Sequence, residues 1–263
     1  MNARYVIRLI SAHIRVIVQT AFRHWVTLVT ETLYPVVKVA VLIFLLRYVY
    51  QSADHALPIN PADAIKYAIQ AGFLSSILGF NNAYVIADRV KSGRVVFDFL
   101  RPVSWFTLML SEYYGTRVSG ALLPALAFAV ITCVGHVGFT IAENVRLLLL
   151  TPAVLLLDFL ISLNVGIVAF WTQNAWGLGL SLAWVQRLLS GIVVPLVLVP
   201  PHLQDIAYAT PFPSLVDAPI RASLGLKATG WAFTKQICWC VLLALLAAAL
   251  YRKAVAHIRI NGG

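Results

Sequence analysis

Long apolar stretches alternate with short polar ones along most of the chain. Six stretches are mostly apolar over about 20 residues or more, the length that a helix needs to cross the hydrocarbon core of a bilayer. They cover residues 25–49, 63–87, 105–134, 147–171, 177–200 and 231–251. Backbone polar groups must find partners within the segment when no water is present, so each stretch is expected to be helical. The pattern predicts an all-α integral membrane protein that forms one transmembrane domain over residues 1–263.

The first polar-apolar pattern, at residues 3–24, does not belong to a span. Its polar side chains fall within one arc of about 100° when the segment is drawn as a helix. Apolar residues fill the rest of the circumference. This is typical of an amphipathic helix that lies in the membrane interface, held by anionic lipid head groups. The polar arc consists of Arg4, Arg8, Arg15, Gln19 and Arg23.

Residues 201–230 form neither a clean span nor a simple loop. Prolines and charged residues such as Asp205, Asp217 and Arg221 alternate with apolar residues. Non-helical backbone at membrane depth is tolerated only where protein buries it or where it lines a cavity. The segment is therefore predicted to form a re-entrant pair of short helices at the outer face.

The distribution of lysine and arginine predicts the orientation. If the N-terminus is cytoplasmic, only three of these residues lie in outer loops, namely Arg146, Arg221 and Lys227. Cytoplasmic loops of membrane proteins are enriched in Lys and Arg, so both termini are predicted to be cytoplasmic. Eleven then lie in inner segments: Arg4, Arg8, Arg15, Arg23, Arg89, Lys91, Arg94, Arg101, Arg252, Lys253 and Arg259.

The composition supports the membrane assignment and excludes other classes. Apolar residues make up 60% of the chain and charged residues 11%, against roughly 25% charged in soluble domains. Disorder is excluded as well, because it requires low hydrophobicity. The net charge of +10 follows from the basic inner segments. No basic run with interleaved aromatic residues suggests nucleic acid, so none is expected as a partner.

Motifs of catalysis and metal binding are missing from the 263 residues. The sequence has no GxxxxGK[ST] phosphate loop, no HExxH and no GxSxG, and its histidines have no metal-ligand spacing. No catalytic or metal site is therefore expected. A membrane enzyme is a weaker alternative and would have to use a cluster such as Glu112 with Tyr113 and Tyr114.

Three charged residues are predicted to lie near the middle of the membrane. Lys38, Asp158 and Arg187 fall about 16–20 Å from the outer ends of their spans. Asp158 and Arg187 lie at similar depth on consecutive antiparallel spans, so they are candidates for an ion pair. Such charges either hold helices together or line a substrate path. Tyr34 and Trp184 also lie deeper than the other aromatic residues and are candidates for a cavity wall.

The inner segment 88–104 alternates basic with apolar residues. As a short amphipathic helix, it could insert apolar side chains into a groove of a partner, with charges around the rim. The alternative interpretation is an ordinary basic inner loop without a specific partner.

Two motifs in this order resemble a known family. They are RVKSGRVVFDFLRPVSW at 89–105 and SGIVVPLVLVPPHLQDIAYATPFPSLVDAPIRASLG at 190–225. Together with the amphipathic N-terminal segment, they resemble the membrane permease of a type-2 ABC exporter, within the subgroup with six spans. The resemblance covers essentially the whole chain.

The resemblance implies a set of partners. Separate ATPase subunits would bind ATP and Mg, with no cofactor in this chain, and the permease would pair with a second copy, identical or homologous. The helix at 3–24 would be a connector helix that also touches the ATPase. The coupling helix within 88–104 would dock into the ATPase through Arg89, Lys91, Arg94, Phe97, Asp98, Phe99 and Arg101.

The resemblance also implies roles along the path. The first and fifth spans would face the dimer axis, which places Tyr34, Lys38, Trp184 and Arg187 near the substrate. The segment 201–230 would close the exit as an outer gate, with Pro201, Pro211, Phe212, Pro213 and Pro219 as its candidate residues.

The function expected from this resemblance is ATP-driven export. The substrate would be an amphiphile, such as a drug, a peptide or a lipid-like molecule, and the location the inner membrane of a bacterium. An ATP-independent channel or secondary carrier is the alternative.

Overall fold

The computed structural model describes residues 12, 16, 25–52, 58–79, 82–101, 103–172 and 175–261. Within these ranges the regular structure is entirely helical. The connector helix predicted at 3–24 falls outside them, apart from two isolated residues. The elements are α2 (Trp25–Ser52), α3 (Pro61–Ile77), α4 (Asn82–Lys91), α5 (Val95–Phe99), α6 (Trp105–Gly120), α7 (Leu122–Val134), α8 (Ile141–Thr172), α9 (Ala175–Leu189), η1 (Leu196–Leu198), α10 (Pro201–Tyr208), η2 (Phe212–Leu215), α11 (Asp217–Ser223) and α12 (Thr229–Asn261).

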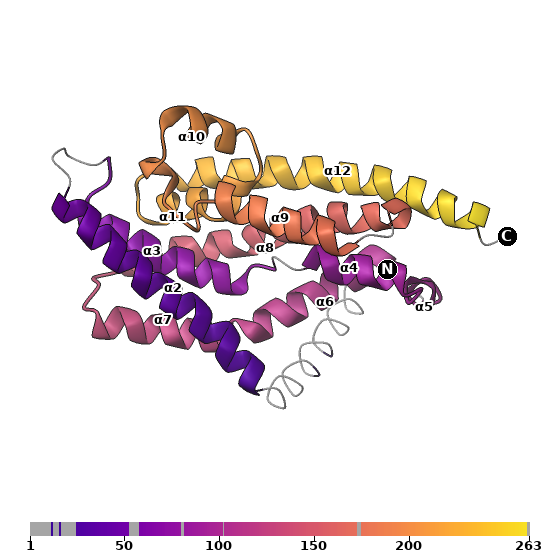
Figure 1. The fold of residues 1–263 in the computed structure, drawn as a ribbon, viewed down its shortest axis with the longest axis horizontal. Coiled ribbons are helices and arrows are strands. Elements are labelled where there is room, and N and C mark those ends of the chain that lie inside the picture. Colours follow the sequence, from indigo (N-terminus) through magenta and orange to yellow (C-terminus); the bar gives the residue numbers. More distant parts are fainter. Residues whose placement is uncertain are drawn as a thin grey trace.

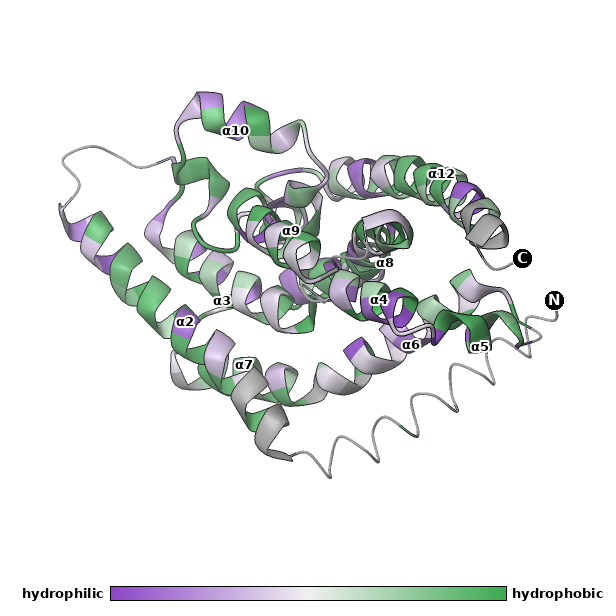
Figure 2. Cartoon of the chain, turned by 45° about the vertical axis from the view of Figure 1, so that its right-hand side comes forward, coloured by the Kyte–Doolittle hydropathy of each residue, from purple (hydrophilic) through white to green (hydrophobic). Residues whose placement is uncertain are grey.

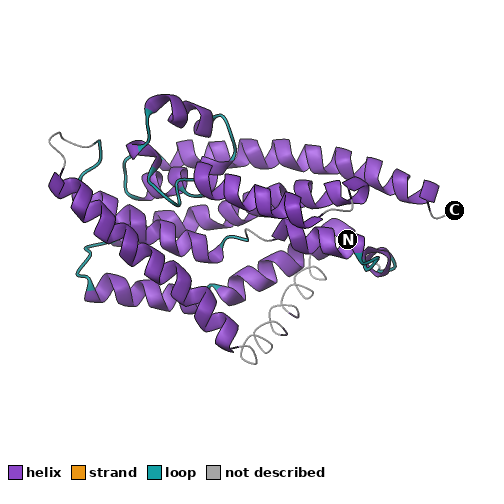
Figure 3. Ribbon diagram, viewed as in Figure 1, coloured by secondary structure: helices purple, strands orange, loops and turns teal. Residues whose placement is uncertain are grey.

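The helices form an elongated bundle whose connections gather at its two ends (Figures 1 and 3). At one end lie the start of α3, the start of α8, and the short helices α10 and α11. At the other end lie α5 and the C-terminal part of α12. The segments that the sequence assigns to opposite sides of the membrane thus lie at opposite ends of the molecule.

Among the described residues, four helical stretches are long and apolar enough to cross a membrane. They include Thr32–Ser52, Trp105–Cys133, Ile141–Thr172 and Thr229–Ala256. Many large apolar side chains are exposed on the outside of the bundle, as in Phe44, which is 76% exposed. Figure 2 shows that hydrophobic residues dominate most of the long helices. Water would disfavour such a surface, whereas lipid tails accommodate it. The predicted spans 25–49, 147–171 and 231–251 lie largely or entirely within α2, α8 and α12.

The predicted span 105–134 consists of two helices that meet at Ala121. Pro124 lies in the first turn of α7 and has no N–H to offer to the carbonyl of Gly120. A proline ring also clashes with the carbonyl four residues earlier, which bends or ends a helix at that point. The bend in this segment therefore follows directly from the sequence.

The predicted span 63–87 is also two helices, because α3 ends at Ile77 and α4 begins at Asn82. At the break, the backbone N–H of Gly79 donates to the Asp158 carboxylate at 2.8 Å. A Cβ atom on Gly79 would lie 2.9 Å from Arg117 and from Tyr113. The chain leaves the helix where a small residue lets the backbone reach this buried carboxylate.

Asp158 lies at the centre of the bundle, with no exposed surface. Besides Gly79, its carboxylate accepts hydrogen bonds from the Tyr113 hydroxyl and the Gln186 amide, both at 2.5 Å. These donors, and not the predicted partner Arg187, are the groups that the structure places on the carboxylate. Arg187 follows Gln186 on α9 and is therefore turned about 100° away from the carboxylate.

The predicted span 177–200 is helical only in its first part. Helix α9 ends at Leu189 after 15 residues, a length of about 22 Å. Gly191 then adopts a φ of +86°, a conformation that favours glycine. The remainder of the segment is irregular apart from the short 3-10 helix η1 (Leu196–Leu198).

Replacing the central carboxylate should destabilise the bundle. Asp158→Leu leaves the Gly79 N–H, the Tyr113 hydroxyl and the Gln186 amide without their acceptor. Each unpaired buried group costs about 1–3 kcal/mol, so the midpoint of thermal unfolding in detergent should fall by several degrees. Asp205→Leu, at an exposed position on α10, serves as the control and should leave the midpoint unchanged. An equally stable Asp158→Leu protein would contradict this role.

Candidate functional site

The inner end carries a short helix on a tight turn. After α4, the chain turns at Ser92 and Gly93, where the Ser92 N–H donates to the Asp88 carbonyl at 2.9 Å. Gly93 has a φ of +71°, as is common for a glycine just past a helix end. Helix α5 (Val95–Phe99) follows at once and projects from the end of the bundle (Figure 1).

Arg89 fixes the position of α5. Its guanidinium donates to Asp98 Oδ2 at 3.2 Å and to Glu112 Oε1 at 2.6 Å, so one side chain joins α4, α5 and α6. Burial alone would lower the pKa of Arg89, but hydrogen bonds to and attraction by Glu112 and Asp98 raise it above its ordinary value. The arginine therefore stays charged, and α5 is tied to the transmembrane bundle.

The two faces of α5 differ sharply in how exposed their side chains are. Val95 and Asp98, three residues apart, are each 5% exposed and face the bundle. On the other side, Val96, Phe97 and Leu100 are 53%, 68% and 77% exposed. We call these three residues the α5 surface. A contiguous group of exposed apolar side chains is typical of a protein-binding site.

Basic residues surround the α5 surface. Lys91, Arg94 and Arg101 are exposed, and Arg94 forms an ion pair with Asp88. Of the predicted coupling residues, Arg89 and Asp98 thus point inward and hold the helix, whereas Phe97 and the other basic residues point outward. Phe99 is partly turned away, at 38% exposed.

Sequence reasoning missed Glu112 as the second anchor of Arg89, and Val96 and Leu100 as part of the outward surface. The boundaries of a five-residue helix would have revealed the surface, because spacing by three residues places Val95 and Asp98 on one face. Nothing local in the sequence indicates the contact between Arg89 and Glu112, which lie 23 residues apart.

Three of the four path candidates lie together. Lys38, half-buried on α2, is close enough to Arg187 on α9 for the two cations to repel each other. The Arg187 guanidinium lies over the Trp184 ring, 5.4 Å from its centroid. Tyr34 lies one turn from Lys38 on α2 and is 63% exposed. Lys38 on α2 and the Arg187–Trp184 pair on α9, which we call the cationic face, thus combine two cations with an exposed indole ring.

At the opposite end, the segment 201–230 is organised by one buried carboxylate. Asp217 has no exposed surface and accepts hydrogen bonds from the Tyr67 hydroxyl at 3.0 Å and the Tyr208 hydroxyl at 2.5 Å. Arg221 lies 3.8 Å from the same carboxylate and donates to the Tyr208 oxygen at 2.7 Å. These four side chains, which we call the Asp217 cluster, join α3, α10 and α11.

The end of α9 is joined to the same cluster. The Asp217 N–H donates to the Ser190 carbonyl at 3.1 Å, and the Tyr67 hydroxyl lies 3.1 Å from the Gly191 carbonyl oxygen. A Cβ atom on Gly191 would lie 2.5 Å from the Tyr67 hydroxyl oxygen. Only glycine allows this close approach.

The predicted gate residues surround the Asp217 cluster but do not form it. Pro213 and Pro219 are buried, Pro211 and Phe212 are half-buried, and Pro201 is exposed at the start of α10. Proline is favoured in the first turn of a helix, where its missing N–H costs nothing. The prolines therefore shape the short helices, while the polar residues between them hold the segment in place. Sequence reasoning missed Tyr67 and Tyr208.

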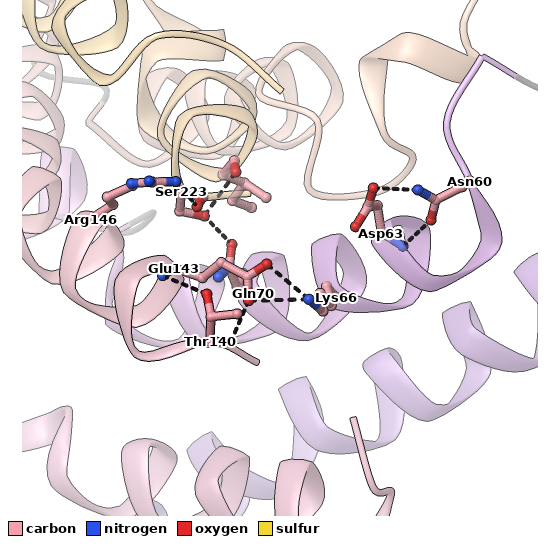
Figure 4. A network of polar contacts seen from close by, with 9 residues as sticks. Asn60, Asp63, Lys66, Gln70, Thr140, Glu143, Arg146 and Ser223 are labelled. Atoms are coloured by element: carbon pink, nitrogen blue, oxygen red, sulfur yellow. Dashed lines mark hydrogen bonds and ion pairs between the residues drawn. The ribbon is translucent and has the colours of Figure 1, made fainter. Parts of the chain in front are cut away.

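A second polar network ties α3 to the start of α8 (Figure 4). Lys66 forms an ion pair with Glu143 at 2.8 Å, and Glu143 also accepts from the Thr140 N–H at 2.7 Å. Thr140 in return accepts from the Glu143 N–H, which completes a capping box at the start of α8. Nearby, the Ser223 hydroxyl donates to Gln70 at 2.6 Å. Both networks therefore hold the same end of the bundle.

Metal chemistry finds no support in the part of the chain that the structure describes. Among those residues, no group of three or more His, Cys, Asp or Glu side chains could hold a metal ion. The candidate sites are instead a docking surface at one end, a cationic face between α2 and α9, and a polar cluster at the other end.

Comparison with known proteins bears on this arrangement. Neither the curated proteins nor the solved structures gave a match. The family model described as ABC-2 family transporter protein matches residues 36–262, which include the α5 surface, the Asp217 cluster and the Lys38 and Arg187 cations. Members of this family are membrane components without an ATPase site of their own and associate with ABC ATPase partners. The chain therefore belongs to the ABC-2 transporter family and is a multi-pass membrane transport subunit of an ABC system.

Proposed function

We propose that this subunit exports an amphiphilic substrate from the cytoplasm, driven by separate ATPase subunits that dock on the α5 surface. The observation that carries the proposal is the division of α5 into two faces. Its inner face is tied to the bundle through Arg89, and its outer face presents Phe97 and Leu100. Because α5 is exposed to a partner and also bonded to the bundle, a partner that moves α5 would move the transmembrane helices with it.

In the proposed mechanism, ATP and Mg bound by the partner draw two ATPase subunits together and move α5. The Arg89 contacts with Asp98 and Glu112 pass this movement to α4 and α6. Because packed helices shift as rigid bodies between discrete arrangements, the movement reaches the far end of the bundle. There the Asp217 cluster would open and release the substrate.

The proposed topology has six spans with both termini in the cytoplasm of a bacterium, and the chain pairs with a second copy, identical or homologous. The broken helices α3–α4 and the short α9 would complete the six spans, with 201–230 re-entering from outside. The exposed faces of α2 and α9 support pairing, since Tyr34 and Trp184 are 63% and 56% exposed. Lys38 and Arg187 would then line the path and favour an anionic or neutral amphiphile. Membrane lipids would surround the assembly.

A channel or secondary carrier is the competing function. Only the ATP-driven exporter requires an ATPase to bind, so ATPase binding distinguishes the two functions. Phe97→Asp places a charge on the α5 surface and should reduce the co-purified ATPase by about tenfold or more, since buried aromatic anchors contribute most to such interfaces. The measurement is affinity purification in detergent with a co-expressed ATPase subunit. Arg101→Glu should weaken binding less, because it lies at the rim.

Leu203→Asp is the matched control for this experiment. Leu203 is 46% exposed on α10, at the opposite end of the molecule, so the variant should retain the ATPase fully. Equal recovery with Phe97→Asp and with Leu203→Asp would refute docking on α5. If the wild-type chain recovers no ATPase at all, the carrier becomes the better proposal.

Removing the intramembrane cations should reduce transport strongly but leave assembly unchanged. In inside-out proteoliposomes with the ATPase, Lys38→Leu and Arg187→Leu should reduce ATP-dependent uptake of a fluorescent fatty acid by about tenfold, while the recovered ATPase stays unchanged. The reason is that each variant removes one attractive charge from a poorly solvated site, worth on the order of 1–2 kcal/mol. Lys38→Arg should transport normally. Unchanged uptake in both leucine variants would show that these charges serve only to pack the helices.

A further inference from the structure

A cavity of about 350 Å³ lies between α3, α7 and α8, away from the cationic face of α2 and α9. Its walls are formed mainly by apolar side chains from these three helices. The volume and the apolar lining with a few polar groups match those of small-molecule binding sites. The principal apolar residues are Ile69, Phe73, Phe128, Ala129, Leu147 and Leu148.

One polar group of the lining is unsatisfied. Gln70 on α3 is 3% exposed, and its Oε1 accepts a hydrogen bond from the Ser223 hydroxyl at 2.6 Å. Its Nε2 is buried and has no hydrogen-bond partner. Figure 4 shows the amide with its oxygen toward Ser223 and its nitrogen turned away from it. A buried donor without an acceptor is costly, and a ligand that offers an acceptor would remove this cost.

The surroundings select against a charged ligand. No residue that lines the cavity carries a charge. The nearby Lys66 and Glu143 neutralise each other at 2.8 Å, and Lys66 also lies over the Phe139 ring, 5.6 Å from its centroid. The Thr132 hydroxyl is already used, since it donates to the Ala129 carbonyl at 2.7 Å. An ion bound here would meet no opposite charge in the lining, and burying an unpaired charge is costly.

We propose that this cavity binds a small uncharged amphiphile that consists of an apolar body and one hydrogen-bond acceptor, such as an ester or amide carbonyl. The acceptor binds Gln70 Nε2, and the apolar body lies between α7 and α8. A two-chain phospholipid does not fit this description. The cavity lies near the lower limit of small-molecule sites in volume, and it offers no cation to a phosphate.

The site connects the ligand to the segment 201–230. Gln70 is bonded to Ser223 at the end of α11, and the Arg146 guanidinium donates to the Ser223 carbonyl at 3.4 Å. A ligand on the free side of the Gln70 amide would hold that side chain in place and, with it, the end of α11. The site is thus separate from the proposed path and does not depend on the direction of transport.

Photoaffinity labelling of the full chain in native membranes tests the proposal. Two probes share a twelve-carbon chain with a terminal diazirine, and one ends in a methyl ester while the other is the plain hydrocarbon. The ester should label peptides of α7 and α8 about three- to tenfold more than the hydrocarbon, as expected for one additional hydrogen bond. Gln70→Leu should remove this preference.

Two variants on α7 separate the cavity from the lipid-facing surface. Ala129→Phe fills the cavity and should reduce labelling by the ester to the level of the hydrocarbon. Val130→Phe adds the same ring at a residue that is 60% exposed and does not line the cavity, and it should label like the wild type. Size-exclusion profiles identify variants that fail to fold. If Ala129→Phe fails to fold, Ala125→Leu, which also fills the cavity from its lining, takes its place.

Several results would overturn the proposal. These are equal labelling by both probes, an unchanged ester preference in Gln70→Leu, or equal labelling of Ala129→Phe and Val130→Phe. A diazirine phosphatidylcholine that labels the same residues as strongly as the ester would identify a lipid site instead. None of these measurements involves the ATPase. They therefore test the cavity proposal separately from the proposed export function.

Discussion

The bundle depends on a buried carboxylate that accepts hydrogen bonds from three different parts of the chain. Asp158 accepts from a tyrosine, a glutamine and a backbone N–H, so four segments converge on one side chain. In a low-dielectric interior, such bonds are strong and their loss is costly. The break between α3 and α4, the position of α9 and the packing of α6 against α8 all follow from this arrangement. A carboxylate therefore fixes the geometry that an all-apolar core of similar helices would leave undetermined.

A second buried carboxylate that accepts several hydrogen bonds lies at one end of the molecule. Asp217 collects tyrosine hydroxyls and an arginine, and it holds short helices that are too small to be stable alone. Arg89 has the corresponding role at the other end, with two carboxylates around one cation. Each end thus has a polar centre, and the apolar helices between them connect the two. In the proposed mechanism, these are the contacts that form and break as packed helices shift between discrete arrangements.

The sequence predicted the helical class and most apolar segments, because length and hydrophobicity alone decide whether a helix suits a bilayer. It did not predict where the helices break. Pro124 could have indicated one break, but the break after Ile77 depends on Asp158, which lies about 80 residues later. It also suggested Arg187 as the partner of Asp158, because depth was estimated without the direction of each side chain. The inward and outward residues of the 88–104 segment could likewise be separated only once the bounds of α5 were known.

The short α9 has a consequence for the membrane around the protein. Its 15 residues reach about 22 Å, less than the hydrocarbon thickness of about 30 Å. It packs against α8, which has 32 residues, so the helix lengths that face the bilayer are uneven around the protein. A bilayer must thin locally along the short side or leave the buried polar turns there in contact with lipid tails. Such mismatch costs free energy for every ångström, so the acyl-chain length of the surrounding lipids becomes a variable that acts on the conformation of the protein.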